Sequence, residues 1–254
     1  ACQFWRSLPQ PPCSCRQVCS HVDSINSGLN VGEMFAEVRS VLVALDCTAE
    51  VAREACQRDF DLVLTHHPVI FRGLKVLVPN DPAVILAAGG KNALSMHTNF
   101  DSAEGGMNDV LCKMLGLSPS GALHEEHGVG CGYVCECDGM NVRELAQRAK
   151  DILGCRVVRF SGGEREISRV GVCSGSGGSF LADAAEKGCQ VLLTGDVKHD
   201  VFIDGENMGV SVIDAGHFYT ENIFCEFIAN ELRNKFSGLR VEIAVSNRDI
   251  VEVI

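Results

Sequence analysis

The chain has 254 residues, of which 46% are hydrophobic and 22% charged, and its formal net charge is -11 at pH 7. This composition indicates a globular chain with a sizeable core, long enough for one large domain or two modest ones. The negative charge argues against a broad nucleic-acid-binding face but permits a small anionic substrate held by metal, and no apolar run reaches the roughly 20 residues that span a bilayer. We therefore expect neither nucleic acid nor a membrane as a partner.

Residues 1–25 are unlike the rest of the chain. The first 22 contain three prolines, Arg6 and Arg16, and no acidic residue precedes Asp23. A basic, acid-poor leader is typical of a transit peptide, but this one lacks a clear amphipathic period, which favours a disordered extension. We expect a cytoplasmic location, with a mitochondrial one as the alternative if the leader is a transit peptide.

The 14 cysteines are scattered through apolar segments, which is typical of reduced core thiols and unlike a dense disulfide framework. Two groups offer a structural zinc site as an alternative, although neither has paired C-x-x-C spacing. These groups are Cys13, Cys15, Cys19 with His21, and His127 with Cys131, Cys135 and Cys137.

A regular pattern begins at Val38. Residues 41–45 form an apolar strand, Thr48 is a plausible N-cap, and residues 50–58 place apolar side chains on one helical face. Residues 62–65 then read as a buried parallel strand that ends in His66, His67 and Pro68. Because ligands bind beyond the carboxyl ends of parallel strands, the two histidines are candidate metal ligands, with a plain surface turn as the alternative.

The following elements keep the same order. Residues 83–88 predict a helix, and residues 93–96 predict a strand that ends in the run from His97 to Asp101. A Gly-Gly pair breaks the chain before a helix predicted over residues 108–115.

The pattern repeats in the second half of the chain. An offset of 129 without a gap sets residues 41–43 on 170–172 and residues 62–65 on 191–194, and an offset of 117 sets residues 94–97 on 211–214. We infer an α/β fold of two similar units related by internal duplication, residues 26–122 and 123–254, with a di-metal site between them. The last strand, residues 241–245, either stays in the second unit or pairs with the first.

Two further candidate ligands, His217 and Glu221, are four residues apart and share one helical face. With His66, His67 and Asp101 they form a set of nitrogen and oxygen donors suited to zinc, manganese, iron or cobalt. Five protein ligands are more than one catalytic ion uses, so the set predicts two divalent ions. Taken singly, His217 also fits a helix start at the surface, Glu221 a solvated acid and Asp101 an N-cap.

Several motifs together resemble one family, the Nif-three-like proteins, also called GTP cyclohydrolase I type 2 homologues. The resemblance covers residues 26 to 254 in order. The motifs are Thr65 to Pro68, His97 to Asp101, the loop Ser174 to Ser179, Thr194 to Asp196, and Asp214 to Glu221.

The resemblance implies a dinuclear site in which His67 and Asp101 hold one ion, His66 and His217 hold the other, and Glu221 bridges. It also implies a toroidal homohexamer of two-domain subunits, here without the middle domain that some members insert. One departure is the run from Ser24 to Leu29, where the family has Trp-Asp-Asn-x-Gly-Leu. This departure affects the expected first helix and the substrate contacts. It does not affect the expected metal site, since all five ligand positions are intact.

These observations predict a metal-dependent hydrolase that acts on a nucleotide, phosphoester or GTP-like ring substrate through a metal-activated water. His97 is the candidate catalytic base, with an outer-shell donor or an interior histidine as alternatives, and Asp196 is a second candidate for relaying the proton. The alternative function is a non-enzymatic regulatory protein whose metals are structural and whose surface recruits protein partners. The glycine-rich loop from Gly175 to Ser179 fits a phosphate cradle or a plain turn, and we assign none of its residues to the site.

Overall fold

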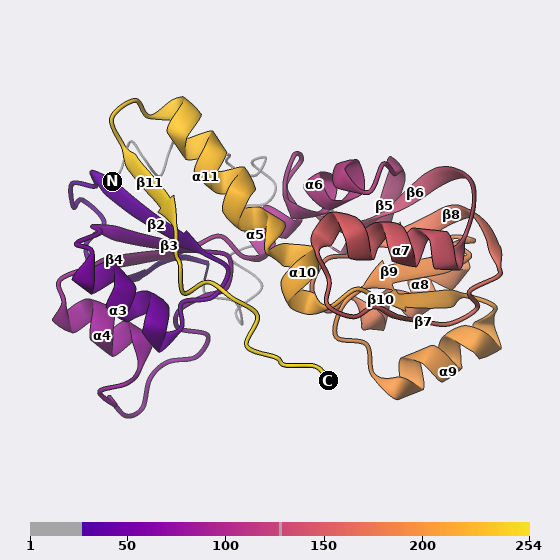
Figure 1. Ribbon diagram of the computed structural model, residues 1–254, viewed down its shortest axis with the longest axis horizontal. Coiled ribbons are helices and arrows are strands. Elements are labelled where there is room, and N and C mark those ends of the chain that lie inside the picture. The colour runs from indigo at the N-terminus through magenta and orange to yellow at the C-terminus, as the bar shows by residue number, and fades with distance from the viewer. Residues whose placement is uncertain (1–26, 127–128) are drawn as a thin grey trace. The chain divides into compact units, whose positions relative to one another are not determined.

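The computed structural model describes residues 27–126 and 129–254, and it divides into two compact units (Figure 1). The first comprises the chain up to Phe100 together with Phe224–Ile250, and the second comprises Asp101–Ile223 with Val251–Ile254. The predicted leader, the first cysteine group and His127 lie outside the described residues. Among the described residues, no helix is both long and apolar enough to cross a bilayer.

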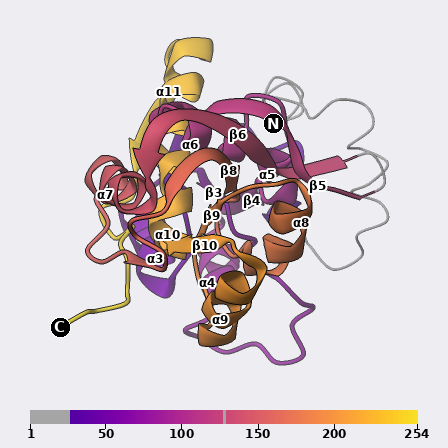
Figure 2. The same ribbon diagram turned by 90° about the vertical axis from the view of Figure 1, so that its right-hand side faces the viewer.

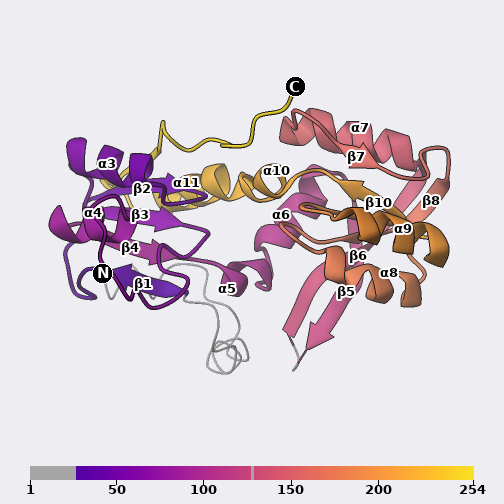
Figure 3. The same ribbon diagram turned by 90° about the horizontal axis from the view of Figure 1, so that it is seen from below.

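The first unit is built on a five-stranded sheet of order β1-β4-β3-β2-β11, in which only β1 runs antiparallel to its neighbour. Figure 3 shows β2, β3, β4 and β1 side by side in this order. The strands are β1 (Gly28–Val31), β2 (Ser40–Ala44), β3 (Leu62–Thr65), β4 (Asn92–Ser95) and β11 (Arg240–Ile243).

Helices cover both faces of this sheet. In Figure 1, α3 and α4 lie on one side of the strands and α11 on the other. Thr48 caps α3 by accepting a hydrogen bond from Val51, as predicted, and Asp81 caps α4. The apolar face of α3 packs with β2 and β3 in one core. The helices are α3 (Ala49–Gln57), α4 (Pro82–Ala88), α5 (Thr98–Asp101) and α11 (Ile223–Lys235).

The second unit is built on a six-stranded sheet of order β5-β6-β8-β9-β10-β7. Its central strands β8, β9 and β10 are parallel, and β5, β6 and β7 run antiparallel to their neighbours. The strands are β5 (Ser118–Glu126), β6 (Val129–Asn141), β7 (Arg159–Phe160), β8 (Glu166–Val172), β9 (Val191–Thr194) and β10 (Ser211–Asp214).

Two cores lie on opposite faces of the second sheet, one under α6 and α7 and the other under α8. Figure 2 shows α7 on one side of the sheet and α8 and α9 on the other. A capping box of Asn141 and Glu144 begins α7, and Gly154 ends it with φ 71°. The helices are α6 (Met107–Met114), α7 (Val142–Leu153), the 3-10 turn η1 (Gly178–Phe180), α8 (Leu181–Glu186), α9 (His199–Met208) and α10 (His217–Glu221).

The unit boundaries differ from the single break predicted between residues 122 and 123. Leu111 and Leu115 of α6 are buried in the core under α7, so residues 101–122 belong to the second unit. At the other end, β11 pairs in parallel with β2, which is the return to the first unit that the sequence left open. The apolar periodicity of α6 predicts burial but does not say against which sheet, because that choice is made by tertiary packing.

The strand pairs of the two units share one register. Val41 pairs with Leu62 in the first sheet, and Val170 pairs with Val191 in the second, which is the predicted offset of 129. The same offset carries α3 onto the run of η1 and α8, since residues 49–57 correspond to 178–186. The α/β fold with two sheets is therefore confirmed, and its ladder registers agree with duplication.

The predicted offset of 117 for the third strand is wrong. Thr65 pairs with Ser95, and its equivalent Thr194 pairs with Asp214, so the offset is 119. A shift of two residues keeps the same side chains on each face of a strand, so the apolar pattern alone cannot detect it. With the corrected offset, Asp214 is equivalent to Ser95 and not to His97.

Candidate metal centre

The histidines of the first unit begin where β3 ends. Thr65, the last residue of β3, donates from Oγ1 to the carbonyl oxygen of His67 at 2.7 Å, and the amide of His67 donates to the carbonyl oxygen of Leu45 at 3.1 Å. These contacts turn the chain directly after the strand. His66 is fully buried and His67 is partly buried.

Both imidazole rings are oriented through Nδ1. His66 Nδ1 donates to the carbonyl oxygen of Met96 at 2.7 Å, and His67 Nδ1 donates to Asp46 Oδ1 at 2.7 Å. Because these acceptors fix the proton on Nδ1, the neutral rings present Nε2 as the metal-binding atom.

His97 lies in the same cluster. Its ring centroid is 5.2 Å from that of His66 and 5.5 Å from that of His67, and one ligand atom from each of the three residues lies within 4.8 Å of the others. The resemblance gives His97 no metal role, yet its position next to His66 and His67 fits either a further metal ligand or a proton acceptor.

The second unit orients His217 in the same way. His217 Nδ1 donates to Asp196 Oδ2 at 2.8 Å, and His217 Nε2 lies 2.9 Å from Glu221 Oε2. The two residues are the first and last of α10, so one helical turn brings both ligand atoms together, as the spacing predicted. Glu221 is 5% exposed, which is typical of a carboxylate with a structural or metal-binding partner.

The backbone of the glycine-rich loop lies directly against the side chains of His217 and Glu221. Gly175 has φ +67°, and a Cβ built on it would lie 2.1 Å from Glu221 Oε1 and 3.3 Å from His217 Nε2. Its amide donates to Thr220 Oγ1, and the amide of Gly177 donates to Thr194 Oγ1. Since these two amides donate to threonine hydroxyls within the protein, they give no support to a phosphate cradle, and the loop packs as a turn against the candidate ligands.

Asp101, the last residue of α5, is connected to this loop through Asn108. Asn108 Nδ2 donates to the carbonyl oxygen of Asp101 at 3.0 Å, and Asn108 Oδ1 accepts from the amide of Ser174 at 2.9 Å. Asn108 is 1% exposed. Sequence reasoning missed this residue, although an asparagine among the apolar positions of a predicted helix was a signal for it.

The candidate ligands therefore fall into two sets. His66 and His67, with His97 beside them, belong to the first unit, and Asp101, His217 and Glu221 belong to the second. In each set imidazole nitrogens are oriented by an acceptor on Nδ1, and the second set adds carboxylates. This mixture of donors fits a divalent transition-metal ion.

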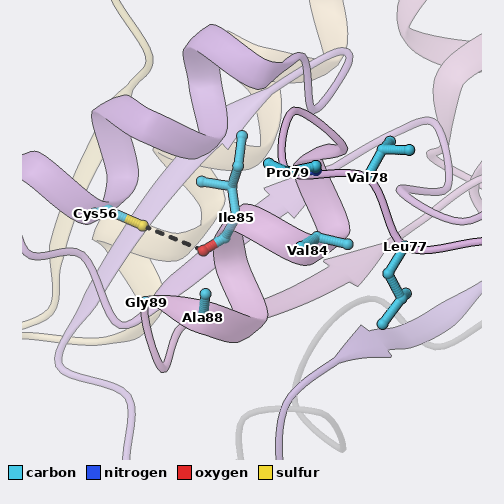
Figure 4. A pocket seen from close by; sticks show the side chains of 8 residues that line it. All are labelled: Cys56, Leu77, Val78, Pro79, Val84, Ile85, Ala88 and Gly89. Carbon is cyan, nitrogen blue, oxygen red and sulfur yellow. Dashed lines mark hydrogen bonds between the residues drawn. The ribbon is translucent and has the colours of Figure 1, made fainter.

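A pocket elsewhere in the first unit contains none of these residues (Figure 4). Its volume is about 570 Å³, and it is lined by Cys56, by residues 77–79 and by apolar side chains of α4 with Gly89. The Cys56 thiol points to the carbonyl oxygen of Ile85 at 3.9 Å. This pocket is apolar, so it offers no chemistry to the candidate metal centre.

All ten described cysteines are free thiols in the structure. Cys135 Sγ lies 3.4 Å from Cys112 Sγ, whereas Cys131 accepts a hydrogen bond from Cys173 that lowers the pKa of Cys131. Within residues 27–126 and 129–254, no metal-capable group of three contains a cysteine. The described members of the second zinc alternative therefore do not converge.

Comparison with known proteins gives the same result as the motifs. The family model for Duf34/NIF3 (NGG1p interacting factor 3) matches residues 15–250. The chain belongs to this family. The resemblance read from the sequence is thus confirmed.

Relatives carry two kinds of name. A GTP cyclohydrolase 1 type 2 homolog of Clostridium perfringens is 35% identical over 206 residues, which is 77% of this chain and 78% of that protein. A NIF3 homolog of Schizosaccharomyces pombe is 31% identical and covers 88% of each chain. A crystal structure of a hypothetical protein from Staphylococcus aureus has a TM-score of 0.82 at 27% identity, over 91% of this chain and 93% of that one.

Proposed function

We propose that this NIF3-family protein is a metal-dependent hydrolase that acts on a small anionic substrate, namely a nucleotide, a phosphoester or a GTP-like ring compound. The observation that carries the proposal is that His66, His67 and His217 are each anchored through Nδ1 by a carbonyl or carboxylate oxygen. Histidines oriented in this way are typical of metal ligands. The name of the Clostridium perfringens relative supports the substrate class.

Two divalent ions are proposed, with zinc, manganese, iron or cobalt as candidates. As the resemblance implies, His67 and Asp101 would hold one ion, His66 and His217 would hold the other, and Glu221 would be shared by both. When bound, two such ions lower the pKa of a shared water and polarise the substrate.

His97 is the proposed base. Its ring centroid is 5.2 Å from that of His66, so it lies beside one of the candidate metal ligands. An imidazole titrates near neutral pH, so it can take the proton from the attacking water and return it to the leaving group. Asp196 is the weaker candidate, because its carboxylate is already engaged with His217 Nδ1.

The second candidate function is a non-enzymatic regulatory protein with structural metals and protein partners. It is favoured by the description of the family as an interacting factor and by the name of the Schizosaccharomyces pombe relative. Ions saturated by protein ligands would favour this function, whereas metal-bound water favours hydrolysis.

Metal analysis followed by a panel assay tests the proposal. The purified protein is reconstituted with each metal, its metal content is measured, and turnover is followed on nucleotides and phosphoesters. We expect about two ions per chain and turnover on at least one substrate. His97→Ala should keep the metal and lose about 10²-fold or more in rate, while a parent protein without stoichiometric metal would refute the proposal.

A cytoplasmic location and a homohexamer complete the proposal. Ten free cysteines, several of them buried, suit a reducing compartment. The hexamer is supported by the resemblance to the family.

A further inference from the structure

An exposed aromatic residue, Phe71, lies next to the histidine cluster of the first unit. The Phe71 ring lies 5.8 Å from the His97 ring at an interplanar angle of 85°, and 6.4 Å from the His67 ring at 42°. Phe71 is nevertheless 53% exposed. What sets Phe71 apart from other exposed apolar residues is that its ring lies against two site residues while the side chain stays open to a ligand.

Positive charge follows directly in the sequence. Arg72 and Lys75 are both exposed, and no acidic residue occurs between Asp61 and Asp81. In a chain of net charge -11 this acid-free stretch is a local exception. The segment therefore combines an open aromatic ring with cations that can attract an anion.

We propose that residues 71–75 form the part of the substrate site that recognises a phosphorylated heteroaromatic ligand such as a nucleotide. The planar base stacks on Phe71, and Arg72 and Lys75 hold the phosphate. This inference rests on the proposed function, because it orients the ligand toward His67 and His97. It narrows the substrate from any phosphoester to one that carries a ring.

The size of the expected effect follows from stacking. Removing an aromatic platform costs about 1–3 kcal/mol per stacked base, and about 1.4 kcal/mol corresponds to tenfold in affinity. The affinity for a ligand with the same phosphate and sugar but no base should be unchanged by removal of the ring. Guanosine 5′-monophosphate and ribose 5-phosphate form such a pair.

Equilibrium dialysis of the metal-loaded full chain measures both ligands. We expect Phe71→Ala to weaken guanosine 5′-monophosphate binding by about tenfold or more, with ribose 5-phosphate changed by less than about twofold. Phe71→Trp should retain binding of the nucleotide. The double variant of Arg72→Ala with Lys75→Ala should weaken both ligands, and the weakening should shrink at high salt.

The matched control is Phe35→Ala, because Phe35 is 79% exposed and belongs to the same unit. It should bind both ligands as the parent does. Metal content and mass in solution, followed by elemental analysis and light scattering, should be unchanged in every variant.

Three outcomes would overturn the inference. One is equal nucleotide binding by Phe71→Ala and the parent, another is an equal loss of both ligands, and the third is a change of oligomeric mass, which would make Phe71 a subunit contact. If the parent turns over a phosphoester but binds both ligands equally, this inference fails while the hydrolase stands. If the nucleotide binds in a Phe71-dependent way without turnover on any substrate, the hydrolase fails while this inference stands.

Discussion

Two aspartates are expected to act on the metal through a histidine. Asp196 Oδ2 accepts from His217 Nδ1 at 2.8 Å, and Asp46 Oδ1 accepts from His67 Nδ1 at 2.7 Å. Each carboxylate fixes the tautomer of its ring and makes Nε2 more basic. We therefore expect Asp196→Asn to weaken metal binding by about 10- to 100-fold, measured by competition with a chelator.

A matched control for this change lies in the second unit. Asp183 Oδ1 accepts from His124 Nδ1 at 2.8 Å, with the same local geometry but outside the candidate ligand set. Asp183→Asn should leave metal binding as in the parent. Equal losses in the two variants would mean that the aspartates act on stability and not on the ligand.

Gly175 is expected to be essential for a different reason. A Cβ there would meet Glu221 Oε1 at 2.1 Å, so Gly175→Ala must displace the proposed bridging carboxylate. Gly188→Ala provides the control, because Gly188 has a similar φ of +72° but no heavy atom within 4 Å of its Cβ position. Both variants carry the strain of an alanine in the left-handed region, about 1–2 kcal/mol.

Metal content and Tm together separate these effects. Both variants should lose thermal stability in the metal-free state, Gly175→Ala by more because its Cβ also displaces the Glu221 carboxylate, and only Gly175→Ala should lose metal. Retention of the parent's metal content by Gly175→Ala would show that Glu221 is not a ligand.

At the scale of elements, the buried side of the connection between α3 and the chain after β11 is made by the Glu54 carboxylate. Glu54 accepts hydrogen bonds from the amides of Val245 and Ser246 and from the Ser246 hydroxyl at 2.6 to 3.0 Å, and Arg58 donates to it at 2.6 Å. Burial alone would raise the pKa of Glu54, but the hydrogen bonds from Ser246, Val245 and Arg58 outweigh it and lower the pKa below 4.5.

The sign of the pH dependence follows from this shift. A carboxyl with a lowered folded pKa stabilises the fold above its unfolded pKa, and the contribution is lost as the pH falls through the folded value. We expect Glu54→Gln to lower the Tm at pH 7, by about 2–4 °C for each kcal/mol lost, and to lower it less below about pH 4.

Thermal unfolding monitored by circular dichroism across pH 3–7 measures this difference. Glu50→Gln on the same helix is the control, because the Glu50 side chain is 57% exposed and its ion pair with Arg248 should contribute little. A Tm difference between Glu54→Gln and the parent that does not change with pH would contradict the assignment to Glu54 ionisation.

The elements that the sequence predicted well are those whose signal is local. β3 begins and ends at the residues predicted for it, and Thr48 caps α3 as predicted. A short apolar strand and an N-cap are decided by a few neighbouring residues, and the duplication added a second copy of the same signal.

Features that depend on contacts between distant segments could not be predicted from the local sequence pattern. The attachment of α6 to the second sheet, the two-residue shift of the third strand and the cluster position of His97 all depend on contacts between segments distant in the sequence. The role of Asn108 belongs to the same class, since its partners Asp101 and Ser174 are 7 and 66 residues away. Periodicity shows which face is buried but not what covers it.

At the scale of the whole molecule, the duplication relates the candidate ligands of the first unit to positions in the second. His66 and His67 follow β3 in the first unit, and the equivalent positions after β9 are Gly195 and Asp196 at the offset of 129. One copy thus carries ligands where the other carries a glycine and an aspartate that orients His217. Equivalent positions of the two copies therefore carry different side chains, candidate ligands in one and a ligand-orienting aspartate in the other.

The whole protein is expected to be a homo-oligomer with negligible affinity for duplex DNA. The resemblance to the family leads us to expect a homohexamer, and exposed apolar residues in the first unit, among them Val76 and Leu77, provide surface that association can bury. Light scattering should therefore give a mass about six times the 27.3 kDa of one chain. Because each chain contributes a net charge of -11, the assembly should repel duplex DNA, and no mobility shift is expected at micromolar protein in low salt. A monomeric mass at micromolar concentration would contradict the assembly, and a shift that weakens with added salt would contradict the expectation drawn from charge.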